Sequence, residues 1–320
     1  MIRAPPPGTL SSVRGLRVGT ATDETLGSGV SVVRFERPVP VAISVRGPAS
    51  GTYDTHSLGL EATFGRREAL FLAGGSVYGL DAARGIRTRL LADGKVTGAF
   101  GGSFPLPRIA GAILYDLPRR FGPIPDYLPL GFEAASVADR RPVPIGRIGA
   151  GRGARVVKYA GPSRSVPGGQ TGAAAAIGRG GRLGLLAVFN SVGAIRDPRT
   201  GAWLAGAVDR NGRLTPPRGD RDRLREPPAG AGTNLGIVVT DLPLDRPGLA
   251  ALAGHVQDGF ARVVEPAHTA TEGDTVFAAS SAPPGASELT DRRPGEWADR
   301  LGRIAEELVA ESARRLFPAR

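Results

Sequence analysis

Few residues of this sequence could provide an activated nucleophile. The chain contains no cysteine, so disulfides, zinc-thiolate sites, iron–sulfur clusters and thiolate nucleophiles are excluded. Its three histidines, His56, His255 and His268, stand far apart in the sequence, without partners at metal-ligand spacing. We therefore expect no metal and no cofactor. If the protein is a hydrolase, its nucleophile should be a hydroxyl.

Thr233 lies where a segment rich in proline, glycine and charge (211–232) changes abruptly into the apolar run 235–239. A threonine at the start of a strand most often serves only as a β-former. The alternative is that its hydroxyl cuts the bond to Gly232 and leaves Thr233 as a new N-terminus. The new α-amine, with a reference pKa of about 7.7–8.0, could then accept the hydroxyl proton. The local sequence leaves both interpretations open.

Lys158 is a second candidate, because this chain uses arginine for nearly all of its basic residues. Only Lys95 and Lys158 are lysines among 41 basic residues. A lone lysine is usually a solvated surface residue. The alternative is a site that needs a compact ammonium whose pKa shifts on burial, which arginine cannot provide.

Three further groups of polar residues have both a catalytic and a structural interpretation. Asn190, at the end of an apolar run, could donate its side-chain amide to an oxyanion or only cap a turn. Glu272 and Asp274 could fix Lys158 and an α-amine by charge pairing, or form a polar turn. Gly74-Gly75-Ser76 could aim backbone N–H groups at an anion, although a tight turn also needs small residues.

The apolar pattern predicts a layered α/β domain, because candidate strands alternate with long helices. We expect a strand pair at 29–35 and 39–45, then strands at 68–73, 109–115, 183–190, 235–239 and 274–280. Helical spacing is present over 77–92, 246–264 and 296–317. Apart from its one strand, 100–144 is expected to be irregular, and the Gly/Ala/Arg-rich stretch 146–181 to wrap a site with its backbone.

Composition excludes several classes of protein. With 320 residues, 41% hydrophobic and 22% charged, the chain is globular and not disordered. The net charge of +11 suggests nucleic acid, but the arginines are scattered and aromatic residues make up only 6%, which is poor for base stacking. Neither 1–17 nor the apolar stretch 183–195 suits a signal peptide or a membrane span. We expect a cytoplasmic protein with no nucleic-acid or membrane partner.

Six motifs in the same order resemble one family closely. They are VGTATD (18–23), GGSVYGLDAA (74–83), GAG (149–151) leading to Lys158, AVFNSVG (187–193), GTNLGIVVTD (232–241) and EGDTVF (272–277). Together they are similar to the autoprocessing N-terminal-nucleophile-like hydrolases. This family includes L-aminopeptidase/D-amidase/D-esterases, β-peptidyl aminopeptidases and 6-aminohexanoate (nylon) oligomer endo-hydrolases.

The resemblance implies a four-layer α/β/β/α sandwich (N-terminal-nucleophile-like, DOM-type), a single domain cut into two chains. The first would be residues 1–232, with 212–232 as a mobile linker, and the second 233–320. Thr233 matches the family nucleophile. Lys158, Asn190, Glu272 and Asp274 match the polar residues that accompany the nucleophile in the family. The residues that match an oxyanion or substrate contact are Gly74, Gly75, Ser76 and Tyr78. A homo-oligomer, a tetramer of αβ units, is also implied.

The implied activity is amide hydrolysis by acyl transfer, in nylon oligomers or at the N-terminus of short peptides and amino-acid amides or esters. Gly232-Thr233-Asn234 stands where many nylon-type members read Asn-Thr-Thr, so the substrate class stays open. Glu272 replaces the usual first aspartate, which leaves its role open.

Two other classes of function remain as alternatives. A Ser–His–Asp hydrolase needs a histidine beside a serine, and the chain has no Gly-x-Ser-x-Gly elbow. A basic, non-catalytic binding module could have the same fold.

Overall fold

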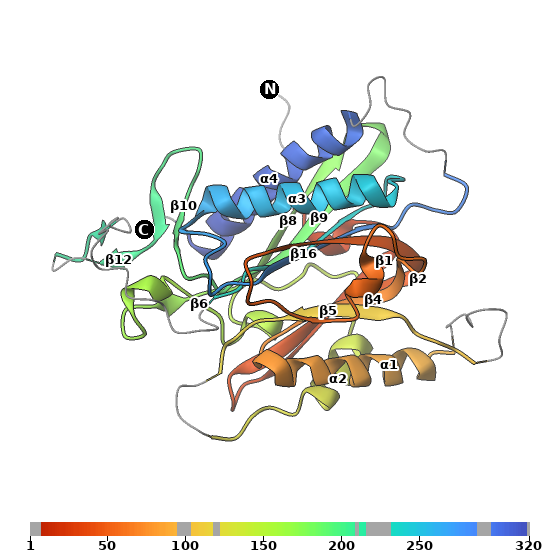
Figure 1. Cartoon of the computed structure of the whole chain (residues 1–320), viewed down its shortest axis with the longest axis horizontal. Coiled ribbons are helices and arrows are strands. Elements are labelled where there is room, and N and C mark those ends of the chain that lie inside the picture. The colour runs from red at the N-terminus through yellow and green to blue at the C-terminus, as the bar shows by residue number, and fades with distance from the viewer. Residues whose placement is uncertain are drawn as a thin grey trace.

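The computed structural model describes residues 8–94, 104–117, 122–208, 211–215, 232–286 and 296–318 (Figure 1). Within these residues, nine strands form one hydrogen-bonded sheet in the order β3-β5-β4-β2-β16-β14-β9-β8, with β1 paired to β2. They are β1 (Leu16–Asp23), β2 (Ser28–Arg46), β3 (Gly51–Tyr53), β4 (Arg66–Ala73), β5 (Ile109–Ile113), β8 (Gly169–Ile177), β9 (Gly181–Phe189), β14 (Leu235–Thr240) and β16 (Asp274–Ser280).

Helices and short strands complete the fold. The helices are α1 (Ala82–Ala92), α2 (Tyr127–Ser136), α3 (Arg246–Val263) and α4 (Glu296–Leu316), and the 3₁₀ turns η3 (Ser76–Asp81) and η5 (Lys158–Ala160) lie near the site described below. Short strands form separate small sheets: β6 (Arg155–Val156), β7 (Val166–Pro167), β10 (Ala194–Arg196), β11 (Trp203–Ala205), β12 (Ala207–Val208), β13 (Leu214–Thr215) and β15 (Val264–Glu265).

The long strand β2 joins two halves of the sheet. Its first part pairs with β1 and β4, and its last part, Val41–Arg46, pairs with β16. The register with β4 shifts between Arg34 and Val39. The strand pair expected at 29–35 and 39–45 is therefore wrong: Glu36-Arg37-Pro38 is a bulge inside one strand, because a bulge bends a strand without reversing it.

The four-layer sandwich is confirmed by three separate apolar cores. Helices α1 and α2 cover the half containing β4 and β5, and α3 and α4 cover the half containing β9, β14 and β16 (Figure 1). The third core lies between the two halves and includes Leu70, Leu72, Leu186, Val188, Ile237 and Phe277. Successive strand residues alternate between cores, as a period of two requires: Leu185 and Phe189 face the helices, whereas Leu186 and Val188 face the other half.

The apolar pattern predicted α3 and α4 but missed α2, in the stretch expected to be irregular. Pro129 hid this helix in the sequence, because proline usually breaks a helix. Here it lies in the first turn, where a helix N–H has no intrahelical acceptor and proline is tolerated. Asp126 caps the helix by accepting from the Leu128 N–H. Gly131 further weakened the pattern, yet it is required, because a Cβ there would lie 2.3 Å from the Ala82 oxygen of α1.

The Gly/Ala/Arg-rich stretch also differs from expectation, because residues 169–177 of it form strand β8. Its small side chains let α4 pack closely, and the Thr171 hydroxyl donates to the Ser312 carbonyl at 2.9 Å. In the expected mobile linker, Leu214–Thr215 forms β13 and pairs with β12. Residues 216–231 of that linker lie outside the described residues.

Candidate active site

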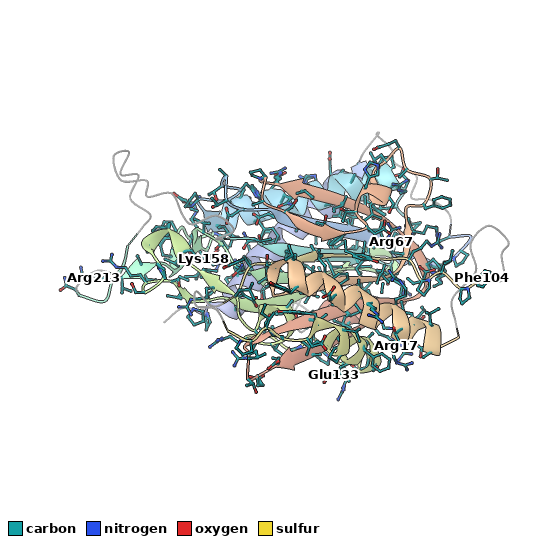
Figure 2. The ribbon with its side chains drawn as sticks, turned by 60° about the horizontal axis from the view of Figure 1, so that its bottom comes forward. Arg17, Arg67, Phe104, Glu133, Lys158 and Arg213 are labelled. Atoms are coloured by element: carbon teal, nitrogen blue, oxygen red, sulfur yellow. The ribbon has the colours of Figure 1, made fainter. Side chains whose placement is uncertain are left out.

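Strand register brings the expected nucleophile and its partners to one end of the sandwich. β14 lies between antiparallel β9 and parallel β16, with Leu235 opposite Val188 and Thr275. The residues just before β14 therefore lie beside the end of β9 and the start of β16. Thr233 donates its N–H to the Asn190 carbonyl at 3.1 Å. Lys158 lies toward this end of the molecule, far from Phe104 (Figure 2).

The Thr233 hydroxyl is buried and lies against the bond that it is expected to cut. Thr233 is only 4% exposed, and its Oγ1 donates to the Gly232 carbonyl oxygen. Gly232 forms a parallel bridge with Glu272. A Cβ at position 232 would lie 2.7 Å from the Val192 nitrogen and 2.8 Å from Glu272 Oε1. Glycine before the threonine is thus required by space.

Lys158 binds the side chain of Asn190, and Thr233 binds the backbone carbonyl of the same residue. Lys158 Nζ donates to Asn190 Oδ1 at 2.8 Å, and the Arg155 N–H donates to the same oxygen at 3.0 Å. Asn190 Nδ2 donates to the Tyr115 carbonyl at 3.2 Å, which links β9 to the chain after β5. An amide nitrogen carries two hydrogens, so this bond leaves one available to another acceptor.

Burial lowers the pKa of Lys158 to about 7, against the opposing effects of Asp116 and Glu272 and with a smaller lowering by Arg155. A shift on burial is what the sequence analysis expects of this lysine. At neutral pH a large part of its amine is therefore uncharged and able to accept a proton.

Asp116 is the carboxylate that raises the pKa of Lys158 most, and it was not among the residues expected from the sequence. Its Oδ2 accepts from Ser28 Oγ at 2.8 Å and its Oδ1 from the Gly75 N–H at 2.6 Å. Ser28 in turn accepts from the Tyr127 hydroxyl at 2.7 Å. Burial raises the pKa of Asp116, and hydrogen bonds from Gly75 and Ser28 counter that rise.

The Gly74-Gly75-Ser76 turn holds Asp116 in this structure and does not present free N–H groups. Gly75 adopts a left-handed φ of 79°. The Gly74 N–H donates to the Gly29 carbonyl at 3.0 Å and the Ser76 N–H to the Leu114 carbonyl at 2.9 Å. All three N–H groups therefore already have acceptors, whereas the sequence led us to expect them to stabilise an oxyanion. Tyr78 follows on η3 and is 47% exposed.

Glu272 and Asp274 both lie at the site, and the charge of Glu272 raises the pKa of Lys158, whereas Asp274 contacts other partners than expected. Glu272 accepts from the Val192 and Thr269 N–H groups, each at 2.8 Å, and burial followed by the charge of Asp274 raises its pKa. Asp274 accepts from the Asn234 N–H at 2.5 Å. In the described structure it hydrogen-bonds Asn234 and His268, and not Lys158 as expected.

Asn234 and His268 are two further residues of the candidate site that were not expected from the sequence. Asn234 directly follows the threonine, and its Oδ1 accepts from the Asn190 N–H at 3.3 Å. The signal for Asp116 was its position just after a buried strand, where polar residues gather at a sheet edge. His268 gave no local signal, because its partner Asp274 is defined only by the folded chain.

His255 has acidic neighbours that the sequence analysis did not identify. Potential ligand atoms of His255, Asp258 and Glu306 lie within 4.8 Å of one another. Their carboxylates are already paired, Asp258 with Arg46 and Glu306 with both Arg262 and His255. In the described part of the chain, no histidine side chain hydrogen-bonds a serine hydroxyl, so the Ser–His–Asp alternative lacks its central contact.

A family model named Peptidase family S58 matches residues 9–317. The chain belongs to peptidase family S58. This S58 chain is 32% identical over 314 residues to an uncharacterized aminopeptidase of Mycobacterium leprae, covering 91% of this chain and 82% of that protein. It is 29% identical over 275 residues to a 6-aminohexanoate-oligomer endohydrolase of Paenarthrobacter ureafaciens, covering 83% of this chain and 73% of that protein.

Solved structures confirm the fold of this S58 hydrolase. The L-aminopeptidase D-Ala-esterase/amidase of Ochrobactrum anthropi, described as a variant of the Ntn hydrolase fold, matches with a TM-score of 0.67 at 20% identity, covering 96% of this chain and 85% of that chain. A Burkholderia sp. β-aminopeptidase matches with a TM-score of 0.65 at 19% identity, covering 96% and 86%. Among the described residues of the S58 chain, no helix combines the length and apolar character needed to cross a membrane.

Replacing Gly75 by alanine in the S58 chain should disrupt the turn that holds Asp116. A Cβ there would lie 2.2 Å from the Tyr127 hydroxyl oxygen, and the φ of 79° is unfavourable for alanine. We expect a loss of about 2–4 kcal/mol in the free energy of unfolding, measured with urea. Gly201→Ala is the control, because Gly201 has a φ of 74° and a Cβ there would have no atom of the described residues within 4 Å. Equal losses in both variants would show that the contact with Tyr127 has no effect.

Removing the charge of Asp116 should lower the pKa of Lys158 further below that of an ordinary lysine. Asp116 raises the pKa of Lys158, so Asp116→Asn should lower it below about 7. With only two lysines in the chain, ¹³C-lysine labelling and NMR titration resolve the signal, which Lys158→Arg assigns. Asp299→Asn, an exposed carboxylate of α4, is the control. An unchanged Lys158 titration in Asp116→Asn would contradict the electrostatic role of Asp116.

Proposed function

We propose that this chain cuts itself between Gly232 and Thr233 and then uses Thr233 as the N-terminal nucleophile of an amidohydrolase. The observation that carries the proposal is that the buried Thr233 hydroxyl contacts the Gly232 carbonyl, while the Thr233 N–H and the Lys158 amine both bind Asn190. The pKa of Lys158, which burial lowers to about 7, supports the proposal. The proposed products are an α chain of residues 1–232 and a β chain of residues 233–320.

In the proposed self-cleavage, Thr233 Oγ1 attacks the carbonyl carbon of Gly232. The neutral Lys158 amine accepts the hydroxyl proton and returns a proton to the Thr233 nitrogen as the C–N bond breaks. The product is an ester between Gly232 and the Thr233 hydroxyl. Water hydrolyses that ester, which releases the Gly232 carboxylate and restores the hydroxyl.

In the mature enzyme, the freed α-amine of Thr233 acts as the general base for the same hydroxyl. The hydroxyl attacks a substrate amide or ester carbonyl, the amine or alcohol leaves, and water hydrolyses the acyl-enzyme. The second hydrogen of Asn190 Nδ2 is the proposed oxyanion donor, and losing one such donor costs about 2.7–4 kcal/mol of barrier. A partly protonated Lys158 keeps the α-amine largely neutral near pH 7, since a nearby positive charge lowers an amine pKa.

The proposed substrates are the N-terminal bonds of short peptides, amino-acid amides and esters, and nylon oligomers. The names of the relatives support this range. An apolar rim for such substrates is proposed from three exposed side chains near the site. Tyr78 and Val77 on η3 are 47% and 63% exposed, and Tyr115 after β5 is 40% exposed. The tetramer of αβ units and the cytoplasmic location stay predictions.

A substrate panel tests the proposed activity. Purified protein is incubated with amino-acid p-nitroanilides, β-peptides and 6-aminohexanoate oligomers, and products are measured by absorbance and mass spectrometry. We expect at least one class to be hydrolysed, with no release by the Thr233→Ala protein. Hydrolysis of equal rate by both proteins would reject Thr233 as the nucleophile, and no hydrolysis by a fully cleaved preparation would favour the binding module.

A further inference from the structure

The imidazole of His268 lies between two oxygen acceptors. Its Nδ1 is 2.9 Å from Asp274 Oδ2, and its Nε2 is 3.2 Å from the Gln257 carbonyl oxygen. A neutral imidazole carries one N–H and one lone pair, so one of these nitrogens would direct a lone pair at an oxygen. Only the doubly protonated ring donates to both acceptors. The contacts therefore select an imidazolium.

The backbone at His268 supports a specific role for this side chain. Its φ is 53°, in the left-handed region that non-glycine residues seldom adopt. The side chain is 16% exposed and Asp274 is fully buried. A strained backbone is thus retained where it places a ring against a buried carboxylate.

The charges around His268 favour a cation at this position. Asp274 contacts the ring, and its charge, after burial, raises the pKa of the neighbouring Glu272. Arg46 is the opposing positive charge, and it is already paired with Asp258. Burial lowers the pKa of His268, but the hydrogen bond and charge of Asp274 outweigh it and raise the pKa above the usual value. The two buried carboxylates repel each other when both are charged, and a cation beside Asp274 lessens that repulsion.

Asp274 transmits this contact to the nucleophile. The carboxylate that accepts from His268 also accepts from the Asn234 N–H at 2.5 Å and from the Asn234 side-chain amide at 3.3 Å. Asn234 is the residue bonded to Thr233, and its side chain also contacts the Asn190 N–H. The connection therefore runs from the ring through one carboxylate to the backbone beside the reactive hydroxyl.

We propose that His268 is a positioning residue, an imidazolium that holds the Asp274 carboxylate on Asn234 and so fixes Thr233 for attack. This inference rests on the proposed role of Thr233, but the charge of His268 does not. His268 acts through Asp274 and touches neither the hydroxyl nor the substrate. A donor without charge at this position should leave the fold in place and impair the reaction.

The charge of His268 is tested first, in the uncleaved Thr233→Ala protein, by ¹³C-histidine NMR titration. With three histidines, His268→Gln assigns the signal by its loss. We expect His268 to titrate above the usual value of about 6.5, and Asp274→Asn to bring it below that value, where burial alone acts. A His268 that titrates at or below 6.5 in the Thr233→Ala protein would overturn the proposal, whatever the activity of Thr233.

The positioning role is tested next with His268→Gln, which keeps a donor and removes the charge. We expect self-cleavage, followed by intact mass, to slow by about tenfold or more, and kcat of the mature enzyme to fall by a similar factor while KM stays the same. His255→Gln is the matched control, because His255 pairs with Glu306 on the helical layer, and both rates should be unchanged.

A His268→Gln protein with an unaltered urea midpoint and wild-type rates would overturn the proposal. If His268→Gln does not fold, the NMR comparison of Thr233→Ala with and without Asp274→Asn still decides it, with the His268 signal assigned by its through-space contact to Gln257. If no protein cleaves itself, the proposed function fails while the titration still reports on the charge of His268.

Discussion

Thr233→Ala is expected to remain a single chain and to hydrolyse none of the substrates, because it removes the hydroxyl that attacks both the Gly232 carbonyl and the substrate. Thr233→Ser keeps a hydroxyl and should give two chains, at a rate that differs because the methyl group is lost. Losing the nucleophile of an acyl-transfer enzyme reduces kcat by about 10⁴–10⁶-fold. Intact mass spectrometry of freshly purified and week-old samples measures the cleavage.

The control for Thr233→Ala is Thr88→Ala, an exposed threonine of α1 whose hydroxyl bonds, among the described residues, only the Arg84 carbonyl one turn earlier. It should cleave itself at the wild-type rate. Urea unfolding of both variants shows whether the fold is kept. A Thr233→Ala protein that still yields a chain beginning at residue 233 would contradict the assignment of the nucleophile, because no other described hydroxyl bonds the Gly232 carbonyl.

Lys158→Arg is expected to have the second largest effect. Arginine keeps the positive charge but does not lose its proton at any accessible pH, so it cannot accept the hydroxyl proton. Removing a general base reduces a rate by about 10²–10⁴-fold, and we expect self-cleavage to slow by that factor. Lys95→Arg, which changes the only other lysine, is the matched control and should cleave normally.

The same role of Lys158 fixes the direction of the pH dependence. Its pKa in the folded protein is about 7, so the amine is neutral above that pH and becomes an ammonium below it. Self-cleavage should therefore be fastest above about pH 7 and fall about tenfold for each further unit of acid. A rate that rises on acidification through pH 7, or a Lys158→Arg protein that cleaves at the wild-type rate, would reject Lys158 as the base.

Strands with long apolar runs and helices with a wide apolar face could be predicted from the sequence. Strand β14 and helix α3 are examples, because burial of one side or both sides determines their residue types. Helix α2 could not, since Pro129 and Gly131 suit it only through its first-turn position and its close contact with α1. Strand β8 could not either, because its small residues are explained by the approach of α4, which lies far along the chain.

Residues of the candidate site could be predicted where a residue type is unusual by itself, and could not where only contacts define them. Thr233 and Lys158 stand out from their surroundings, and motif order places Asn190, Glu272 and Asp274 beside them. The contact of Asp116 with Gly75 joins positions that are 41 residues apart. Assigning the glycine turn to an oxyanion contact was therefore natural from the sequence, but its N–H groups bind acceptors that no local pattern reveals.

The central claim is that the reactive hydroxyl belongs to an N-terminus created by cleavage before Thr233. It is tested most directly by intact mass spectrometry and N-terminal sequencing of the purified, active wild-type protein. The account predicts two chains, one of them beginning Thr-Asn-Leu-Gly. Fully active protein that runs as one uncut chain, or whose smaller chain begins at any other residue, would contradict it.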